Sequence, residues 1–333
     1  FEVFGNFAAG RAARAHLAFR LTMPGPVNER ISRVGTSLRL GSALPTLSWV
    51  RGEGWHTSPA VDAFSESVAT EVADWDVRVR VPDGFTVLST GAEVEPGRFV
   101  ASAVRDWAAT IGRLRLAEGT AQDGRTKVVV GVDAATGDDE QARLRTTIET
   151  LDAMAARYGP YPWPVLTVGI TPSLSGGIEF PQHLQVGLGT PDAHLIHEVA
   201  HMWFYALVGN DQYADPWLDE GLTEYAEARH MGTLGSVRSE TIPPGGAGQL
   251  GEGHDYWAAR TGIFFRSVYV QGAQALAALG DVAGGVEGVD CALRRFVLEH
   301  ANTVADPADF VSSFQAQTGA DPRPVLERFG VTE

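Results

Sequence analysis

The residues with the clearest chemical potential are two histidines on one predicted helix and a glutamate beyond it. His197 and His201 lie four positions apart in the segment His197-Glu198-Val199-Ala200-His201. Residues at this spacing share one face of an α-helix, so the two imidazoles can converge on one metal ion. Glu220 follows after eighteen intervening residues and can supply a carboxylate ligand from a second helix. Two histidines, one carboxylate and an open fourth position for water are typical of a catalytic zinc site.

Glu198 directly follows the first of these histidines and can reach a metal-bound water. As a general base it would take a proton from that water, and as a general acid it would pass the proton to the leaving amine. The flanking residues 195–196 and 202–204 are apolar, as in a buried helix. We therefore expect a hydrolase with one zinc ion per chain, bound by the two histidines and Glu220.

Two further glutamates, Glu224 and Glu227, follow Glu220 by four and seven positions and share its helix face. A histidine that binds metal through one ring nitrogen usually donates its other N–H to a carboxylate or a carbonyl. We expect one of these glutamates to accept that bond, with a solvent-facing position as the alternative for each. His194, one turn before His197, is expected in the first helical turn and partly solvated.

The elements that would position these residues follow a change in hydrophobic pattern along the chain. In the first third, short segments alternate apolar and polar residues, which is typical of half-buried strands. These predicted strands cover residues 14–23, 75–81, 85–90, 99–104, 108–116 and 127–132. We interpret this region as an antiparallel β-sandwich or saddle.

The pattern changes near residues 133–140, where a helix is predicted. Asp138 and Asp139 can cap it, its apolar stripe runs to Tyr158, and Gly159 can end it. The remaining predicted elements are strands at 165–170 and 185–188, the helix of the two histidines, and helices at 218–229, 256–279, 289–300, 305–318 and 322–329.

The composition describes a soluble globular protein of two or three domains. The 333 residues are 44% hydrophobic and 20% charged, and no apolar stretch is long enough for a transmembrane helix. A net charge of −15 argues against nucleic acid and anionic membranes as partners.

Cys291 is the single cysteine, so no internal disulfide is possible, and its helical context favours a buried position. Because the chain begins at Phe1 rather than Met, as processed or trimmed products do, we expect an extracytoplasmic rather than a cytoplasmic location.

Five short segments each match or resemble a known sequence motif. The run from His197 to Phe204 fits the pattern H-E-x-x-H-x-W, and residues 217–221 fit W-L-N-E-G with Asp219 in place of Asn. Residues 176–180 are similar to G-x-M-E-N, with Ile in place of Met and Phe in place of Asn. Residues 269–272 are similar to Y-x-K-G, and residues 159–162 to a G-P-Y-P connector. Together these segments resemble the aminopeptidase N family of gluzincin zinc metallopeptidases.

The resemblance implies an α+β protein in three parts. An N-terminal antiparallel β-sandwich or saddle domain would occupy residues 1–127, and a thermolysin-like zinc catalytic domain residues 128–284. A short C-terminal helical segment would follow at residues 285–333. Both the β-domain and the helical tail are short for the family, so the chain resembles a compact or trimmed member.

The resemblance also implies roles for residues near the metal. Tyr269 would donate a hydrogen bond to the oxyanion that forms when water attacks the carbonyl. Glu179 would pair with the positively charged α-amine of a peptide, and Gly176 and Gly177 would let the substrate backbone approach closely. The family also uses a polar residue from its β-domain to hold the amine, and the sequence shows no clear counterpart.

These residues favour a zinc aminopeptidase that binds its peptide substrate beside the strand at residues 185–188. An endopeptidase or another amide hydrolase on the same fold is the alternative, and it would be favoured if Glu179 does not face the zinc. A non-catalytic peptide-binding module is a third possibility. Loss of the base or of a ligand would be typical of such a module, but Glu198 and all three ligands are present.

Overall fold

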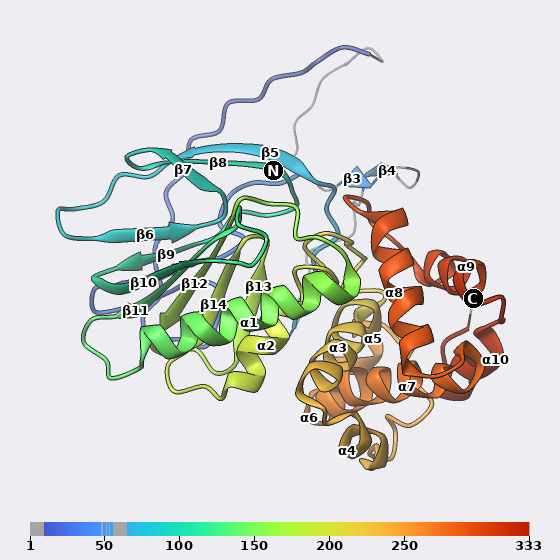
Figure 1. Cartoon of the computed structure of the whole chain (residues 1–333). Coiled ribbons are helices and arrows are strands. Elements are labelled where there is room, and N and C mark those ends of the chain that lie inside the picture. The colour runs from blue at the N-terminus through green and yellow to red at the C-terminus, as the bar shows by residue number, and fades with distance from the viewer. Residues whose placement is uncertain (1–9, 48, 51, 53, 56–64, 333) are drawn as a thin grey trace.

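The computed structural model describes residues 10–332 except positions 48, 51, 53 and 56–64. The first nine residues of the predicted β-domain therefore lie outside the described part. Figure 1 shows strands gathered in the N-terminal half and helices in the C-terminal half, with one long helix, α1 (Glu140–Tyr158), lying across the strands. This α+β arrangement agrees with the fold class that the sequence predicts.

The N-terminal half consists of small antiparallel sheets. A four-stranded sheet has the order β1 (Ser32–Val34), β2 (Ser37–Leu40), β9 (Ala109–Gly112), β6 (Thr86–Ser89). A three-stranded sheet has the order β5 (Ala73–Arg78), β8 (Arg98–Val104), β7 (Ala92–Glu95), and β3 (Trp49–Val50) pairs with β4 (Gly54–Trp55). A separate apolar cluster around Trp107 and Ile111 packs between the four-stranded and the three-stranded sheets, as in a sandwich.

The strand predicted at residues 14–23 is wrong. The structure has no regular strand there, and residues 10–22 are exposed. Alternating apolar residues fit a pleated, half-buried surface, but a strand also needs a partner edge, and none pairs with this segment in the described part of the chain.

The second half of the sheet structure is a five-stranded sheet that carries part of the candidate site. Its order is β10 (Leu114–Thr120), β11 (Lys127–Asp133), β12 (Val165–Thr171), β14 (His183–Gly187), β13 (Gly177–Phe180). The middle strands β11, β12 and β14 are parallel, and the two edge strands are antiparallel to their neighbours. The sheet includes β10, which ends at Thr120, and β11, which begins at Lys127. The domain boundary at residues 127–128 remains a prediction.

The edge of this sheet differs from the expected one. The strand predicted at residues 185–188 corresponds to β14, which lies between β12 and β13. Glu179 lies within β13, which is the edge strand and lies next to the strand beside which we expected the peptide to bind. The unpaired backbone that a peptide could use therefore belongs to β13.

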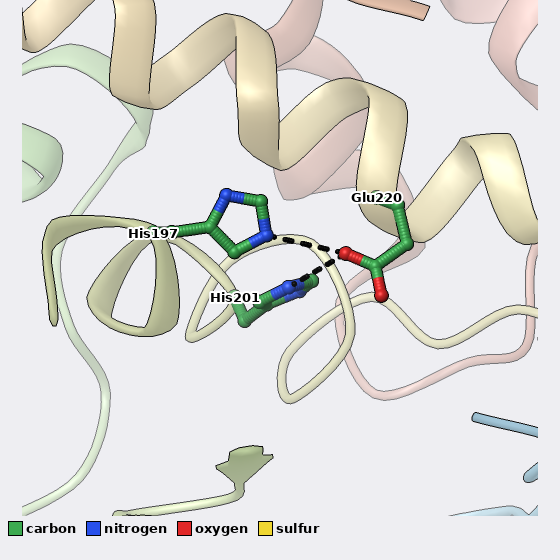
Figure 2. Close-up of side chains that lie close together, drawn as sticks. All are labelled: His197, His201 and Glu220. Carbon is green, nitrogen blue, oxygen red and sulfur yellow. Dashed lines mark hydrogen bonds and ion pairs between the residues drawn. The ribbon is translucent and has the colours of Figure 1, made fainter. Parts of the chain in front are cut away.

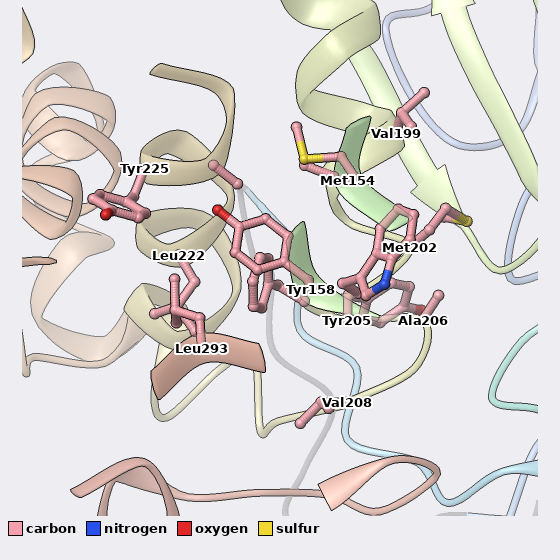
Figure 3. Packing of buried hydrophobic residues seen from close by; sticks show 14 of the residues in the cluster. Met154, Tyr158, Val199, Met202, Tyr205, Ala206, Val208, Leu222, Tyr225 and Leu293 are labelled. Carbon is pink, nitrogen blue, oxygen red and sulfur yellow. The ribbon is translucent and has the colours of Figure 1, made fainter. Parts of the chain in front are cut away.

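Helix α1 covers the five-stranded sheet. The side chain of Asp139 accepts hydrogen bonds from the backbone N–H groups of Gln141 and Ala142, and Gly159 ends the helix with φ 118°. Helix α2 (Asp192–Ala200) packs against α1 and against β13 and β14. Figure 3 shows the shared core, in which Met154 and Tyr158 of α1 lie near Leu222 and Tyr225 of α3 (Leu222–Met231).

The other helices form the C-terminal half. They are α4 (Leu234–Ser239), α5 (His254–Trp257), α6 (Thr261–Phe265), α7 (Gln271–Ala283), α8 (Val286–His300), α9 (Pro307–Thr318) and α10 (Arg323–Leu326). The single helix predicted at residues 256–279 is thus interrupted at residues 258–260, and a π-helical turn separates α6 from α7. Cys291 on α8 is exposed, so its predicted burial is wrong. No helix in the described residues is both long and apolar enough to span a membrane.

Two π-helical turns, Trp217–Gly221 and Arg266–Val270, carry Glu220 and Tyr269. Glycines bring these turns together, because a Cβ placed on Gly272 would lie 2.5 Å from the Cα of Gly221. This backbone contact sets the position of Tyr269 relative to Glu220.

A buried arginine joins distant parts of the chain. Arg105, 2% exposed, donates hydrogen bonds to the carbonyl oxygens of Thr70 at 2.7 Å, Thr303 at 3.1 Å and Ala206 at 3.4 Å. Its guanidinium therefore connects the β-rich half, the segment after α2 and the helical half.

Candidate metal centre

The two histidines and the glutamate converge as three buried side chains (Figure 2). Oε2 of Glu220 lies 3.2 Å from Nε2 of His197 and 3.2 Å from Nε2 of His201. Ligands bound to a tetrahedral zinc ion at about 2.0–2.1 Å would lie roughly 3.3–3.4 Å from one another. The separation and the His–His–Glu donor set therefore fit zinc, with a fourth position left for water or substrate.

His197 is held from behind by a carboxylate. Its Nδ1 lies 3.1 Å from Oε2 of Glu227 and 3.6 Å from Oε2 of Glu224. Glu227 is thus the nearer of the two candidates for a hydrogen bond from this ring nitrogen, and Glu224 lies alongside. Such a contact fixes the ring so that Nε2 presents its lone pair to the metal.

His201 is held by three oxygen atoms. Its Nδ1 lies 2.9 Å from Oδ1 of Asp219, 3.0 Å from the carbonyl oxygen of Phe204 and 3.1 Å from Oγ1 of Thr223. These acceptors favour a proton on Nδ1 and leave Nε2 free to bind metal. We did not predict the contact with Asp219. The signal was present, since Asp219 directly precedes the ligand Glu220 and replaces a usual Asn.

Glu198 lies on α2 between the two histidines and is 5% exposed. Its Oε2 has no hydrogen-bond partner within the described residues, so it is free to act on a water or a substrate. Burial raises the pKa of the Glu198 carboxyl to about 7, although His197 and His201 act to lower it. A carboxyl that titrates near neutral pH suits a group that must both accept and donate a proton.

Gly177 lies directly behind this carboxylate. A Cβ at Gly177 would come within 2.3 Å of Cγ of Glu198. The glycine of β13 therefore makes room for Glu198. Gly176, beside it, has φ 84°, in the left-handed region that favours glycine.

Tyr269 contacts two of the proposed ligands. Its hydroxyl donates a hydrogen bond of 2.6 Å to Oε1 of Glu220, and its ring stacks on that of His197 with centroids 5.6 Å apart and planes 16° from parallel. The proposed oxyanion donor therefore lies at the metal site, with its hydroxyl directed towards the ligand carboxylate.

All ten site residues predicted from the sequence line or contact one cavity of about 300 Å³. Glu179 lines it from β13 and is 5% exposed. Burial, reinforced by the negative charge of Glu66, raises the pKa of Glu179 well above its ordinary value. His194 also lines the cavity and is exposed on the first turn of α2.

Glu66 is a cavity residue that sequence reasoning missed. It belongs to the β-rich half, and Nη2 of Arg30 donates a hydrogen bond of 2.6 Å to its Oε1. No motif surrounds Glu66 in the sequence. Only the fold shows that a polar residue of the β-rich half reaches the cavity.

Comparisons with known proteins agree with this geometry. Residues 192–245 match the peptidase family M1 domain. The chain is 26% identical over 163 residues to aminopeptidase B of Homo sapiens and to aminopeptidase B of Rattus norvegicus. Each match covers 45% of this chain and 25% of the relative, so the chain matches about a quarter of the length of these curated proteins.

Solved structures share the fold. The M1 zinc metallopeptidase from Deinococcus radiodurans superposes with a TM-score of 0.63 and 20% identity, covering 94% of this chain and 74% of that one. A mutant of the same enzyme bound to a Tyr-Ser-Ala substrate gives a TM-score of 0.59 and 22% identity, covering 79% and 65% of the two chains. With the zinc-type donor set on α2 and the π-helical turn after it, the chain is therefore similar to the aminopeptidase N-like gluzincins and has the fold of the M1 zinc metallopeptidases.

Proposed function

We propose that this protein is a zinc aminopeptidase, which removes the first residue from peptides. One observation carries the proposal. A carboxylate oxygen of Glu179 lies within 4.8 Å of ligand atoms of Glu198 and His201, so a buried acid stands beside the metal centre. A peptide with its α-amine at Glu179 would have its first carbonyl near the proposed zinc position, because amine and carbonyl are separated by one α-carbon.

The ammonium group of such a peptide would compensate the charges at this end of the cavity. Glu179 is buried without a basic partner among the ion pairs of the described residues, whereas Glu66 already pairs with Arg30. A charge-assisted hydrogen bond to an ammonium stabilises the ionised form of a buried carboxyl. Glu66, in the same cavity, would be the second acidic contact for the amine.

The backbone of the substrate would lie along β13. This strand is the edge of its sheet, and an extended peptide can add to such an edge through main-chain hydrogen bonds. Gly176 and Gly177 at its start line the same cavity, so a substrate bound there would pass beside them.

The chain's own residues would then carry the proton transfers. Bound zinc supplies Lewis-acid polarisation of the carbonyl and lowers the pKa of a bound water. Glu198 would accept a proton from the attacking water and deliver it to the leaving amine. Tyr269 would turn its hydroxyl from Glu220 towards the oxyanion as negative charge develops there.

The test compares a short peptide that has a free amine with the same peptide acetylated. We expect release of the first residue from the free peptide and no cleavage of the acetylated one. Glu179→Ala should narrow this difference by weakening hydrolysis of the free peptide. Glu149→Ala, which removes an exposed carboxylate of α1 outside the cavity, is the matched control and should keep the difference.

Cleavage of acetylated peptides at internal bonds, at the rate of free peptides, would contradict the proposal. It would instead favour the endopeptidase alternative, with Glu179 as a structural acid.

A further inference from the structure

The segment that carries Glu66 into the cavity is bound to the helical half by a buried glutamine. Gln212 lies between α2 and the π-helical turn of Glu220, and it is 1% exposed. Its Oε1 accepts a hydrogen bond of 2.9 Å from the backbone N–H of Val68. Its own backbone N–H donates one of 3.2 Å to the carbonyl oxygen of Val68. Val68 follows Glu66 by two residues, so Gln212 fixes the backbone beside this acid.

The other end of the same side chain reaches the metal centre. Nε2 of Gln212 donates a hydrogen bond to Oδ2 of Asp219, which is also buried. Oδ1 of Asp219 lies 2.9 Å from Nδ1 of His201, whose Nε2 faces Glu220 and the metal position. Polar contacts therefore run without a break from the backbone near Glu66 to a metal ligand. A carboxylate behind a ligand histidine holds the orientation of its ring.

The two neighbours of Gln212 fix the orientation of its amide. The backbone N–H of Val68 can only donate, so it requires the amide oxygen, and the ionised carboxylate of Asp219 can only accept, so it requires the amide NH2. If the amide turned over, both hydrogen bonds would be lost in a buried position. A mismatch introduced at one end must therefore be borne at that end or passed to the other.

Glu66 itself is held from both halves of the chain. Arg30 of the β-rich half pairs with its carboxylate at 2.6 Å, and the ring of His254 on α5 forms a hydrogen bond with its backbone. Together with the contacts of Gln212, these set the position of Glu66 in the cavity before a substrate binds.

We propose that Gln212 is a positioning residue that holds Glu66, at the amine end of the cavity, in register with the metal ligand His201. A disturbance at Asp219 then reaches zinc binding, recognition of the amine, or both. The recognition of the amine rests on the proposed aminopeptidase function, whereas zinc binding can be measured independently of it.

The experiment exchanges donor and acceptor between Gln212 and Asp219. Asp219→Asn introduces an NH2 group, which must face either the NH2 of Gln212 or the N–H of His201. The alternative is that Gln212 turns over and leaves the N–H of Val68 unpaired. Adding Gln212→Glu removes the mismatch, because its carboxylate can accept from both Val68 and the new amide. The double variant also keeps the single negative charge of the native pair.

Zinc affinity is the first readout. We expect Asp219→Asn to bind zinc about tenfold more weakly, at the lower end of what loss of a partner behind a ligand histidine costs, and the double variant to recover most of this loss. The matched control combines Asp219→Asn with Gln274→Glu. It makes the same Gln-to-Glu change on α7, outside the cavity, and should not recover zinc affinity.

Recognition of the amine is the second readout. It is the ratio of kcat/KM for an alanyl peptide to that for the lactoyl peptide, in which a hydroxyl replaces the α-amine. We expect this ratio to fall about threefold in Asp219→Asn and to recover in the double variant, as coupled residues do. If Asp219→Asn does not fold, a folded double variant beside an unfolded control combination supports the same link.

The outcomes separate this inference from the proposed function. A loss in either readout that Gln212→Glu restores, and Gln274→Glu does not, supports the role of Gln212. Native values in Asp219→Asn, or no recovery in the double variant, would overturn it. A native protein that does not distinguish the alanyl from the lactoyl peptide would contradict the aminopeptidase proposal, and the zinc affinities would then decide the role of Gln212 by themselves.

Discussion

The hydroxyl of Tyr269 donates a hydrogen bond of 2.6 Å to Oε1 of Glu220, while Oε2 of the same carboxylate faces both histidines at 3.2 Å. One carboxylate thus divides its oxygens between the metal site and the tyrosine. The contact orients Glu220 before substrate arrives, and it holds the hydroxyl of Tyr269 close to the position where an oxyanion would form.

Tyr269→Phe removes the hydroxyl and keeps the ring stacked on His197. We expect kcat to fall by about 10²–10³, because loss of one oxyanion donor has that effect, with a smaller change in KM. Steady-state kinetics with a free-amine peptide would measure both constants. A rise in KM at constant kcat would instead make Tyr269 a substrate-binding residue.

Gly272→Ala tests the backbone contact that places this pair. The new methyl group would lie 2.5 Å from the Cα of Gly221, so the two π-helical turns must move apart. Overpacking of this kind costs about 1–3 kcal/mol, and we expect lower Tm and weaker zinc binding. Gly235→Ala on α4 is the control, since its added methyl has no neighbour within 4 Å. Equal Tm and zinc affinity in the two variants would show that the contact is not needed.

Glu198→Gln should keep zinc and lose most turnover. The amide preserves the shape of the side chain but cannot accept the proton, and general acid–base groups contribute roughly 10²–10⁴-fold. Metal analysis and peptide hydrolysis on the same preparation would check both parts. Full activity in this variant would exclude Glu198 as the base.

Glu220→Ala should weaken zinc binding. It removes the carboxylate whose Oε2 faces both histidines, and two histidines alone form an incomplete site. Competition with a chromogenic chelator would measure the affinity, with Glu149→Ala as the control. Zinc affinity equal to that of the native protein would show that Glu220 is not a ligand.

His183 predicts a dependence of stability on pH. Its ring is fully buried, with Nδ1 2.7 Å from Oγ1 of Thr167 and Nε2 3.0 Å from Oγ1 of Thr110, and burial lowers its pKa to about 3. The unfolded chain, with an ordinary histidine pKa near 6.5, therefore binds more protons than the folded one between about pH 3 and 6.5. Stability from this group is present above that range and is lost as pH falls.

The measurement compares the native protein with His183→Gln in urea unfolding at pH 7 and pH 5. From the shift, the native protein should lose about 2 kcal/mol more than the variant over this interval. Equal losses would mean that His183 takes up a proton in the folded state.

Local spacing is what made the metal centre predictable. His197 and His201 need one helical turn to meet, and the helix is specified by its own residues. Glu220 has the position expected from a second helix, although it lies in a π-helical turn rather than within a regular α-helix. Such a bulge depends on packing, here on the glycine contact with the tyrosine's helix, and no pattern in the sequence encodes it.

Long-range relationships were the part that the sequence could not provide. Glu66 reaches the cavity through the fold of the β-rich half and its pairing with Arg30. The alternation at residues 14–23 predicted a strand that the structure does not have, because strand formation depends on a partner elsewhere. Asp219 was visible in the sequence, yet its contact with His201 follows from the way two helices pack.

Arg105 has a consequence for the order of folding. Its three carbonyl partners are separated from it by 35, 101 and 198 residues. Contacts between such distant positions are slow to form, and a guanidinium that is buried before its acceptors arrive is costly. The histidines of α2 and the nearby Glu220 can come together before Arg105 makes these contacts. The complete cavity needs acids from both halves of the chain, so it cannot form before them. During refolding the chain should therefore regain its metal before it regains turnover.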